Sequence, residues 1–141
     1  MFIRIVLSLL LAALAPIPIA SAQPEKRTPT VTVVSSREIS NIPGKSFVIV
    51  RVDFPPGAVS PPHRHAGSAF IQAFVESGTL RNEVEGDGVR DYSAGQYWYE
   101  EPGAHHLRTE NLSRSAPAVL FADIIMDTGD EPLTIYDEPG Q

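Results

Sequence analysis

The chain has 141 residues, of which 43% are hydrophobic and 20% are charged, a composition typical of one globular domain. Its formal net charge of −6 argues against nucleic acid as a partner, because proteins bind nucleic acid through basic surfaces. The sequence contains no cysteine, which excludes disulfides, thiolate metal ligands and cysteine nucleophiles.

The first 22 residues have the pattern of a secretory signal peptide. Arg4 supplies a positive start, residues 5–15 are apolar apart from one serine, and Ala20-Ser21-Ala22 offers the small residues that a signal peptidase needs. We expect cleavage between Ala22 and Gln23 and a secreted or periplasmic protein without a stable membrane anchor. The alternative is an uncleaved anchor, but prolines interrupt the apolar run before it reaches membrane-spanning length.

The mature chain is expected to begin with a flexible, polar leader over residues 23–30, followed by a β-domain over residues 31–126. Short β-branched and aromatic segments at spacings of about ten residues, separated by glycine and proline turns, indicate an all-β sandwich or barrel. These segments are residues 31–34, 46–54, 69–75, 79–84, 96–99 and 118–125. Residues 127–141 are acidic and are expected to form a peripheral tail.

All four histidines fall in two short clusters, His63 with His65 and His105 with His106. Residues two apart on a strand point to the same face, so the first pair can converge on one metal ion while Arg64 faces away. A solvent-exposed edge strand is the alternative for that pair alone. In the second cluster only one of the two neighbouring histidines can face inward.

The spacing of both clusters resembles the two motifs of the cupin superfamily. Five residues separate Gly57 from His63-Arg64-His65, as in the first motif, and Gly78 matches its closing glycine one residue late. In the second motif, Gly95 is followed after five residues by Glu101-Pro102-Gly103-Ala104-His105-His106, and a glutamate stands where proline is usual. Asn111 comes one residue later than the pattern expects.

The resemblance implies a double-stranded β-helix, that is, a cupin or jelly-roll barrel, with one divalent metal ion. It implies that His63, His65 and His106 bind this ion, and that His105 points outward. Imidazole ligands suit several metals, so Fe, Mn, Zn, Ni and Cu all remain open.

The glutamate ligand usual in the family should fall near Phe70 or Ile71, and neither can bind a metal. Gln72 is the nearest side chain with an oxygen to offer, and a β-bulge could turn it inward; otherwise it faces out. Glu100 and Glu101 are the other carboxylate candidates for the metal, but we expect both on the solvated approach to the Pro102-Gly103 turn. The expected centre therefore has three imidazoles and open positions.

We expect a metal-dependent enzyme that acts on a small organic molecule, with dioxygenase-like chemistry favoured. The alternative is a non-enzymatic module that binds a small molecule, a sugar or a metal. Arg51, Arg81 or Arg108 could bind a substrate carboxylate, although exposed strand arginines are the simpler interpretation. Open sheet edges, together with the resemblance, also predict a homodimer.

Overall fold

The computed structural model describes residues 27–138, and this part of the chain contains ten β-strands and no helix. The all-β fold expected from the turn spacing is therefore confirmed. The strands are β1 (Thr30–Glu38), β2 (Lys45–Phe54), β3 (His63–His65), β4 (Phe70–Ser77), β5 (Thr79–Val84), β6 (Gly88–Ser93), β7 (Tyr97–Glu100), β8 (His105–Asn111), β9 (Ala118–Asp127) and β10 (Thr134–Tyr136). Among residues 27–138 no helix has the length and apolar character to cross a membrane. The expected signal peptide lies outside the described residues.

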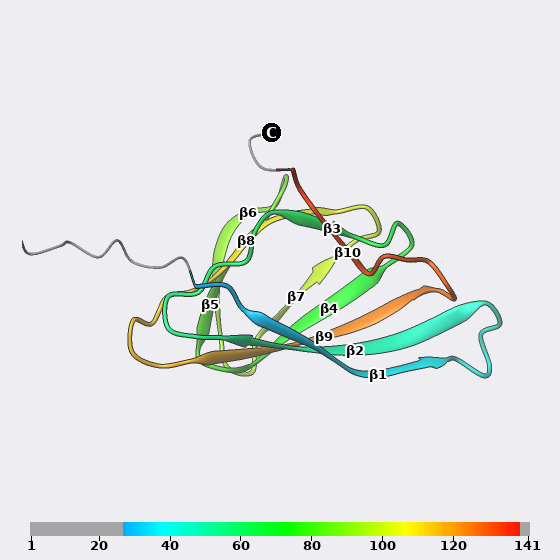
Figure 1. Ribbon diagram of the computed structural model, residues 1–141, viewed down its shortest axis with the longest axis horizontal. Coiled ribbons are helices and arrows are strands. Elements are labelled where there is room, and N and C mark those ends of the chain that lie inside the picture. Colours follow the sequence, from blue (N-terminus) through cyan, green and yellow to red (C-terminus); the bar gives the residue numbers. More distant parts are fainter. Residues whose placement is uncertain (1–26, 139–141) are drawn as a thin grey trace, which may run out of the picture.

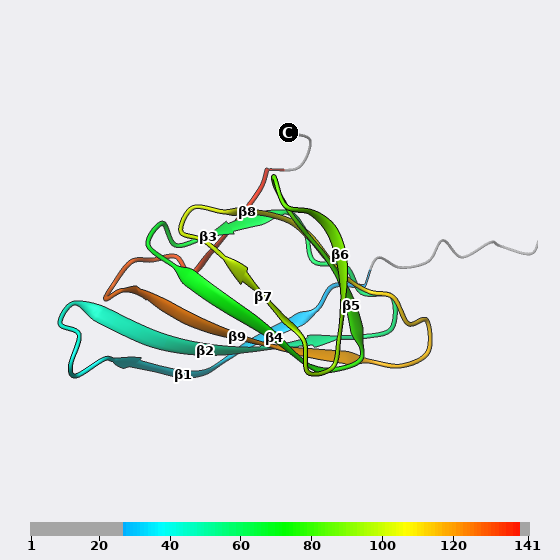
Figure 2. The same cartoon turned by 180° about the vertical axis from the view of Figure 1, so that it is seen from behind.

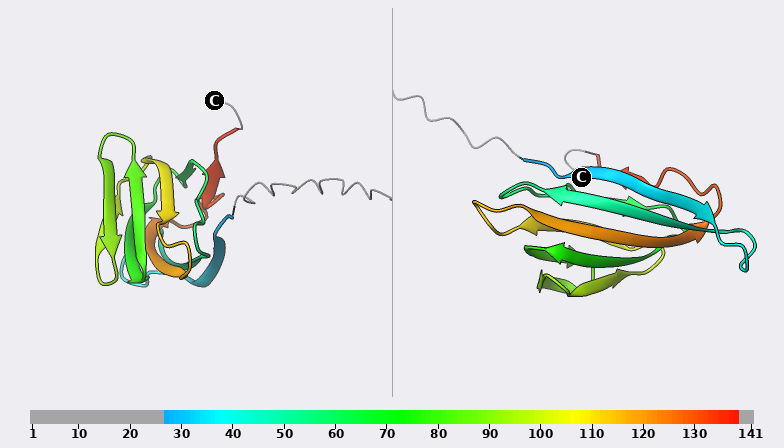
Figure 3. Two further views of the ribbon diagram at one scale, coloured as in Figure 1. Left: turned by 90° about the vertical axis from the view of Figure 1, so that its left-hand side faces the viewer. Right: turned by 90° about the horizontal axis from the view of Figure 1, so that it is seen from below.

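Two five-stranded antiparallel sheets face each other (Figure 1). Sheet A has the strand order β1-β2-β9-β4-β7, which the right panel of Figure 3 shows from below, and sheet B has the order β10-β3-β8-β5-β6. Figure 2 views the same arrangement from behind, with β5 and β6 closing one end of the molecule. This is the double-stranded β-helix, or jelly roll, that the sequence predicts.

Alternating polarity along the strands decides which face of each sheet is buried. In β5, Leu80, Asn82 and Val84 point inward, whereas the residues between them lie nearer the surface. β2, β4 and β7 alternate in the same way, so each of these strands contributes about every second side chain to the interior. The core forms two neighbouring clusters. One contains Phe54, Ala58, Ala73, Val75, Leu80, Trp98, Ala118 and Leu120; the other contains Val48, Val50, Ala66, Ala69, Ile71, Ile124 and Met126.

Both ends of the expected β-domain differ from the structure. Thr30, placed in the flexible leader, begins β1, and the carbonyl of Arg27 accepts a hydrogen bond of 3.0 Å from the Val59 amide. Residues 134–136, placed in the peripheral tail, form β10 and pair with β3. Residues 134–136 (Thr-Ile-Tyr) do favour a strand, but a run of three residues is too short to be recognised without the pairing to β3.

β1 forms one edge of sheet A, and its side chains Val31, Val33 and Val34 are each about half exposed. An edge strand with apolar side chains is suited to pairing with another chain. The homodimer remains a prediction.

Gly78 sits between β4 and β5 with a φ of +82°, a conformation that residues with a side chain rarely adopt. A Cβ at this position would lie 2.6 Å from Ala118 Cβ and 2.9 Å from its Cα. Gly86 has a similar φ of +90°, but a Cβ there would meet nothing within 4 Å.

We therefore expect Gly78→Ala to destabilise the protein more than Gly86→Ala. Both variants lose about 1 kcal/mol to the left-handed backbone conformation. Only the first also overpacks the core, at a further cost of about 1–3 kcal/mol. Urea unfolding of both variants measures the difference, and equal stabilities would contradict this account of the β4–β5 turn.

Candidate metal centre

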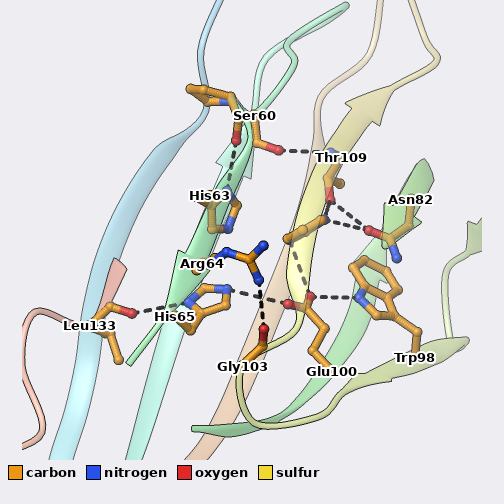
Figure 4. Close-up of polar contacts among 12 residues, drawn as sticks. Ser60, His63, Arg64, His65, Asn82, Trp98, Glu100, Gly103, Thr109 and Leu133 are labelled. Carbon is orange, nitrogen blue, oxygen red and sulfur yellow. Dashed lines mark hydrogen bonds and ion pairs between the residues drawn. The ribbon is translucent and has the colours of Figure 1, made fainter. Parts of the chain in front are cut away.

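Three histidines meet inside the barrel because β3 and β8 are neighbours in sheet B. The register of this pair places His63 opposite His106, and His65 lies two residues further along β3 (Figure 4). One ring nitrogen from each of these three histidines lies within 4.8 Å of the other two. The three histidines chosen from the sequence are therefore brought together, and this group could hold a metal ion.

The neighbours of these histidines point to the other side of sheet B. The Arg64 guanidinium is exposed and donates a hydrogen bond of 2.8 Å to the Gly103 carbonyl (Figure 4). His105 Nε2 lies 2.8 Å from an Asp137 carboxylate oxygen. The structure thus separates His105 from the inward group, as expected for adjacent residues on one strand.

Backbone carbonyls orient the two imidazoles of β3. His63 Nδ1 lies 2.8 Å from the Pro61 carbonyl, and His65 Nδ1 lies 3.2 Å from the Leu133 carbonyl. A carbonyl oxygen can only accept, so both rings donate from Nδ1 and keep the lone pair of Nε2 free. Such an outer hydrogen bond is the usual way in which proteins orient a metal-binding histidine.

His106 is oriented by two polar residues that sequence reasoning did not single out. Its Nε2 lies 2.7 Å from Asn82 Oδ1 and 2.7 Å from Thr109 Oγ1, and the Thr109 hydroxyl donates to the same Asn82 oxygen. His106 therefore donates from Nε2 and keeps the lone pair of Nδ1 free. The strand pattern contained a signal for Asn82, because it occupies an inward position between Leu80 and Val84.

Glu100 corrects an expectation, since it is buried rather than solvated. Its side chain is 4% exposed, because β7 alternates between the outward Tyr97 and Tyr99 and the inward Trp98 and Glu100. The Trp98 indole donates a hydrogen bond of 3.0 Å to Glu100 Oε1, which also lies 3.3 Å from His106 Nδ1. Glu100 Oε2 lies 3.5 Å from His65 Nε2 (Figure 4). Glu101, in contrast, is exposed.

Gln72 is not brought to the histidines. Its neighbours on β4, Ile71 and Ala73, line the interior cavity, so Gln72 lies on the opposite face of the strand. A register shift does occur in β4, but it lies between Val75 and Ser77, beyond Gln72. The irregularity therefore cannot turn the Gln72 side chain inward.

The three histidines and Glu100 open onto a cavity of about 330 Å³ between the two sheets. Most of its wall is apolar and comes from β2, β4 and β9. Both ends of the described chain also contribute, through Thr28 and Pro29 on one side and Leu133, Thr134 and Tyr136 on the other. The Tyr136 ring centroid lies 5.7 Å from that of His63. The segments expected to be a leader and a tail thus help to enclose the site.

Burial keeps the inner imidazoles neutral. It lowers the pKa of His63 to about 4, with a further contribution from the nearby His106. Burial likewise lowers the pKa of His106 to about 4, aided by the nearby His65. Neutral imidazole is the form that binds metals, so these two rings need not lose a proton at neutral pH.

The same lowered pKa values predict acid sensitivity of the metal-free protein. The unfolded chain takes up protons near pH 6.5 and the folded chain only near pH 4, so the free energy of unfolding falls as the pH drops through this window. We expect a loss of about 2 kcal/mol per histidine at pH 5. Urea unfolding of chelator-treated protein at pH 7.5 and pH 5 measures it. A His63→Gln/His106→Gln variant should lose less, and an unchanged pH dependence in this variant would refute the explanation.

Comparison with known proteins places these features in a family. The family model for the cupin domain matches residues 50–124, which is more than half of the chain. Germin-like protein 9-2 of Oryza sativa subsp. japonica is 25% identical over 120 residues; the match covers 82% of this chain and 56% of that protein. The chain thus spans just over half the length of this curated relative.

Solved structures share the fold. A conserved protein with a double-stranded β-helix domain from Klebsiella pneumoniae superposes with a TM-score of 0.60 at 18% identity, covering 82% of this chain and 90% of that one. Oxalate oxidase in complex with the substrate analogue glycolate gives a TM-score of 0.60 at 21% identity, covering 80% of this chain and 57% of that one. A cupin domain from Bordetella pertussis gives 0.53 at 20% identity, covering 72% and 96%. Family match, fold and the placement of the two histidine clusters agree, and the chain belongs to the cupin family.

Proposed function

We propose that this protein is a metal-dependent cupin enzyme that transforms a small organic molecule. In this proposal His63, His65 and His106 hold one divalent ion, and the substrate occupies the adjoining cavity. The observation that supports it best is the convergence of three oriented imidazoles on the wall of a cavity of about 330 Å³, a size typical of small-molecule sites. A bound divalent ion would supply Lewis-acid or redox chemistry, and we favour oxygen-dependent chemistry.

The cavity lining indicates what kind of substrate would fit. Among the described residues that line it, none is lysine or arginine. The three strand arginines considered from the sequence form ion pairs away from the cavity, Arg51 with Asp53, Arg81 with Asp91 and Arg108 with Glu83. We therefore propose a substrate with an apolar body, whose polar group lies toward the histidines. An apolar wall of this kind suits a larger and less polar molecule than oxalate. The similarity to oxalate oxidase therefore supports the fold but not oxalate as the substrate.

A non-enzymatic binding module is the second candidate. It is favoured by the predominantly apolar lining, which offers few groups for proton transfer besides the histidines and Glu100. Elemental analysis of the purified protein, followed by oxygen-uptake measurements with phenolic, thiol and sugar-acid compounds, separates the two candidates. A redox-active metal with turnover supports the enzyme, whereas a redox-inert metal without turnover supports the binding module.

Single histidine variants test the proposed metal centre. We expect His63→Ala, His65→Ala and His106→Ala each to lose a ligand and to weaken metal binding by several kcal/mol. His105→Ala is the matched control, because its ring faces Asp137 on the other side of β8. Metal content measured by elemental analysis decides the matter. Loss of metal from His105→Ala with retention by His106→Ala would contradict the proposed ligand set.

Export is part of the proposal and rests on the sequence of the first 22 residues. In its native host, the protein should be found in the exported fraction with Gln23 as its first residue. N-terminal sequencing of that fraction measures this directly. An intact Met1 in exported protein would show that the segment is not cleaved.

A further inference from the structure

We infer that Glu100 of β7 is a fourth protein ligand of the metal ion, an inference that rests on the proposed function. Its carboxylate is 4% exposed, yet its only ion-pair partners among the described residues are the rings of His65 and His106. A buried carboxylate without a cationic partner is costly, because the protein interior solvates charge poorly. The burial of Glu100 therefore calls for a positive charge close to it.

The hydrogen-bond pattern places that charge between Glu100 and the histidines. His65 donates from Nδ1 to Leu133, and His106 donates from Nε2 to Asn82 and Thr109. The nitrogens that remain face the carboxylate: His106 Nδ1 lies 3.3 Å from Glu100 Oε1, and His65 Nε2 lies 3.5 Å from Oε2. In both contacts, a lone pair of the imidazole nitrogen points toward a lone pair of the carboxylate oxygen.

Two of these atoms are unsatisfied within the described structure. Both His106 Nδ1 and Glu100 Oε2 are buried and have no hydrogen-bond partner. Buried polar atoms without partners are rare in folded proteins and call for an explanation, such as a bound ion. A divalent cation explains both atoms at once, because it accepts lone pairs from the imidazoles and from the carboxylate together.

Strand register explains how Glu100 reaches the site. β4 and β7 pair so that Ile71 lies directly opposite Glu100, and both side chains face the cavity. Cross-strand partners in an antiparallel pair have Cβ atoms about 5 Å apart. Glu100 thus brings a carboxylate next to a β4 position that holds only a hydrocarbon side chain. The Trp98 indole, donating to Oε1, holds this carboxylate in place.

Metal affinity tests the inference. Zn²⁺ binding is measured by competition with a chelator for the wild-type protein and for Glu100→Gln, which keeps the size of the side chain and removes its charge. We expect binding to weaken by roughly 10-fold or more, since losing even an outer partner of a metal ligand costs that much. Glu101→Gln, a change at the exposed neighbour, is the matched control and should bind like the wild type. With Co²⁺ as the probe, the visible absorption should change in Glu100→Gln and not in Glu101→Gln.

A measurement on the unaltered protein covers the case in which Glu100→Gln fails to fold. With glutamate carboxyl groups labelled by ¹³C, the infrared difference spectrum between Zn²⁺-loaded and metal-free protein should show one shifted carboxylate band. The absence of any shifted band at saturating Zn²⁺ would overturn the assignment of Glu100.

The outcomes also separate this inference from the proposed function. Tight Zn²⁺ binding that depends on His106 but is equal in wild type and Glu100→Gln, with identical Co²⁺ spectra, would overturn Glu100 as a ligand and leave the histidine centre intact. No binding by the wild-type protein, or equal binding by His106→Ala, would instead overturn the metal centre itself.

Discussion

The antiparallel pairing of β3 with β8 is the constraint on which the site depends. It sets His63 directly opposite His106 and so joins residues that are more than forty positions apart in the chain. The strand alternation then decides every neighbouring side chain: His65 joins the inward group, while Arg64 and His105 are directed to the outer face. A shift of one residue in this register would send the wrong histidine inward. β10 covers the free edge of β3 and helps to hold the pairing in place.

The interior combines an apolar barrel with a compact cluster of histidines. Hydrogen bonds to the outer nitrogen of each ring hold this cluster in place. Each inward imidazole has its outer nitrogen bound to an oxygen acceptor: a carbonyl for His63 and His65, and the Asn82 amide for His106. Burying three imidazoles costs free energy, and these contacts recover part of it by satisfying one nitrogen of each ring. The nitrogens that remain are fixed in direction and lie beside the cavity. The site is thus preorganised for a ligand that accepts lone pairs.

The second sheet contributes through a different register, that of β4 with β7. Because Ile71 and Glu100 are cross-strand partners, sheet A presents one hydrocarbon and one carboxylate side by side to the histidines of sheet B. The remainder of the sheet A face is apolar, through residues such as Val50, Leu120 and Ile124. The cavity therefore has one polar wall and one apolar wall. This division supports a ligand whose polar group meets the histidines and whose body packs against β2 and β9.

The sequence by itself determined the fold class, the approximate positions of most strands and the inward direction of His63, His65 and His106. These features follow from the alternation of residues along each strand and from the spacing within the two histidine clusters, both of which span only a few residues.

β10 and the inward placement of Glu100 were decided only by the tertiary structure. β10 has only three residues, and it exists because β3 offers an unpaired edge. Glu100 was expected in solvent because it adjoins a turn, but the pairing of β7 with β4 directs its side chain into the space between the two sheets. The orientation of Gln72 was likewise left open by the sequence: the register shift in β4 lies between Val75 and Ser77, and only the pairing with β9 shows that Gln72 faces outward. Which strand lies beside which is a property of long-range pairing, and the local pattern of residues does not contain it.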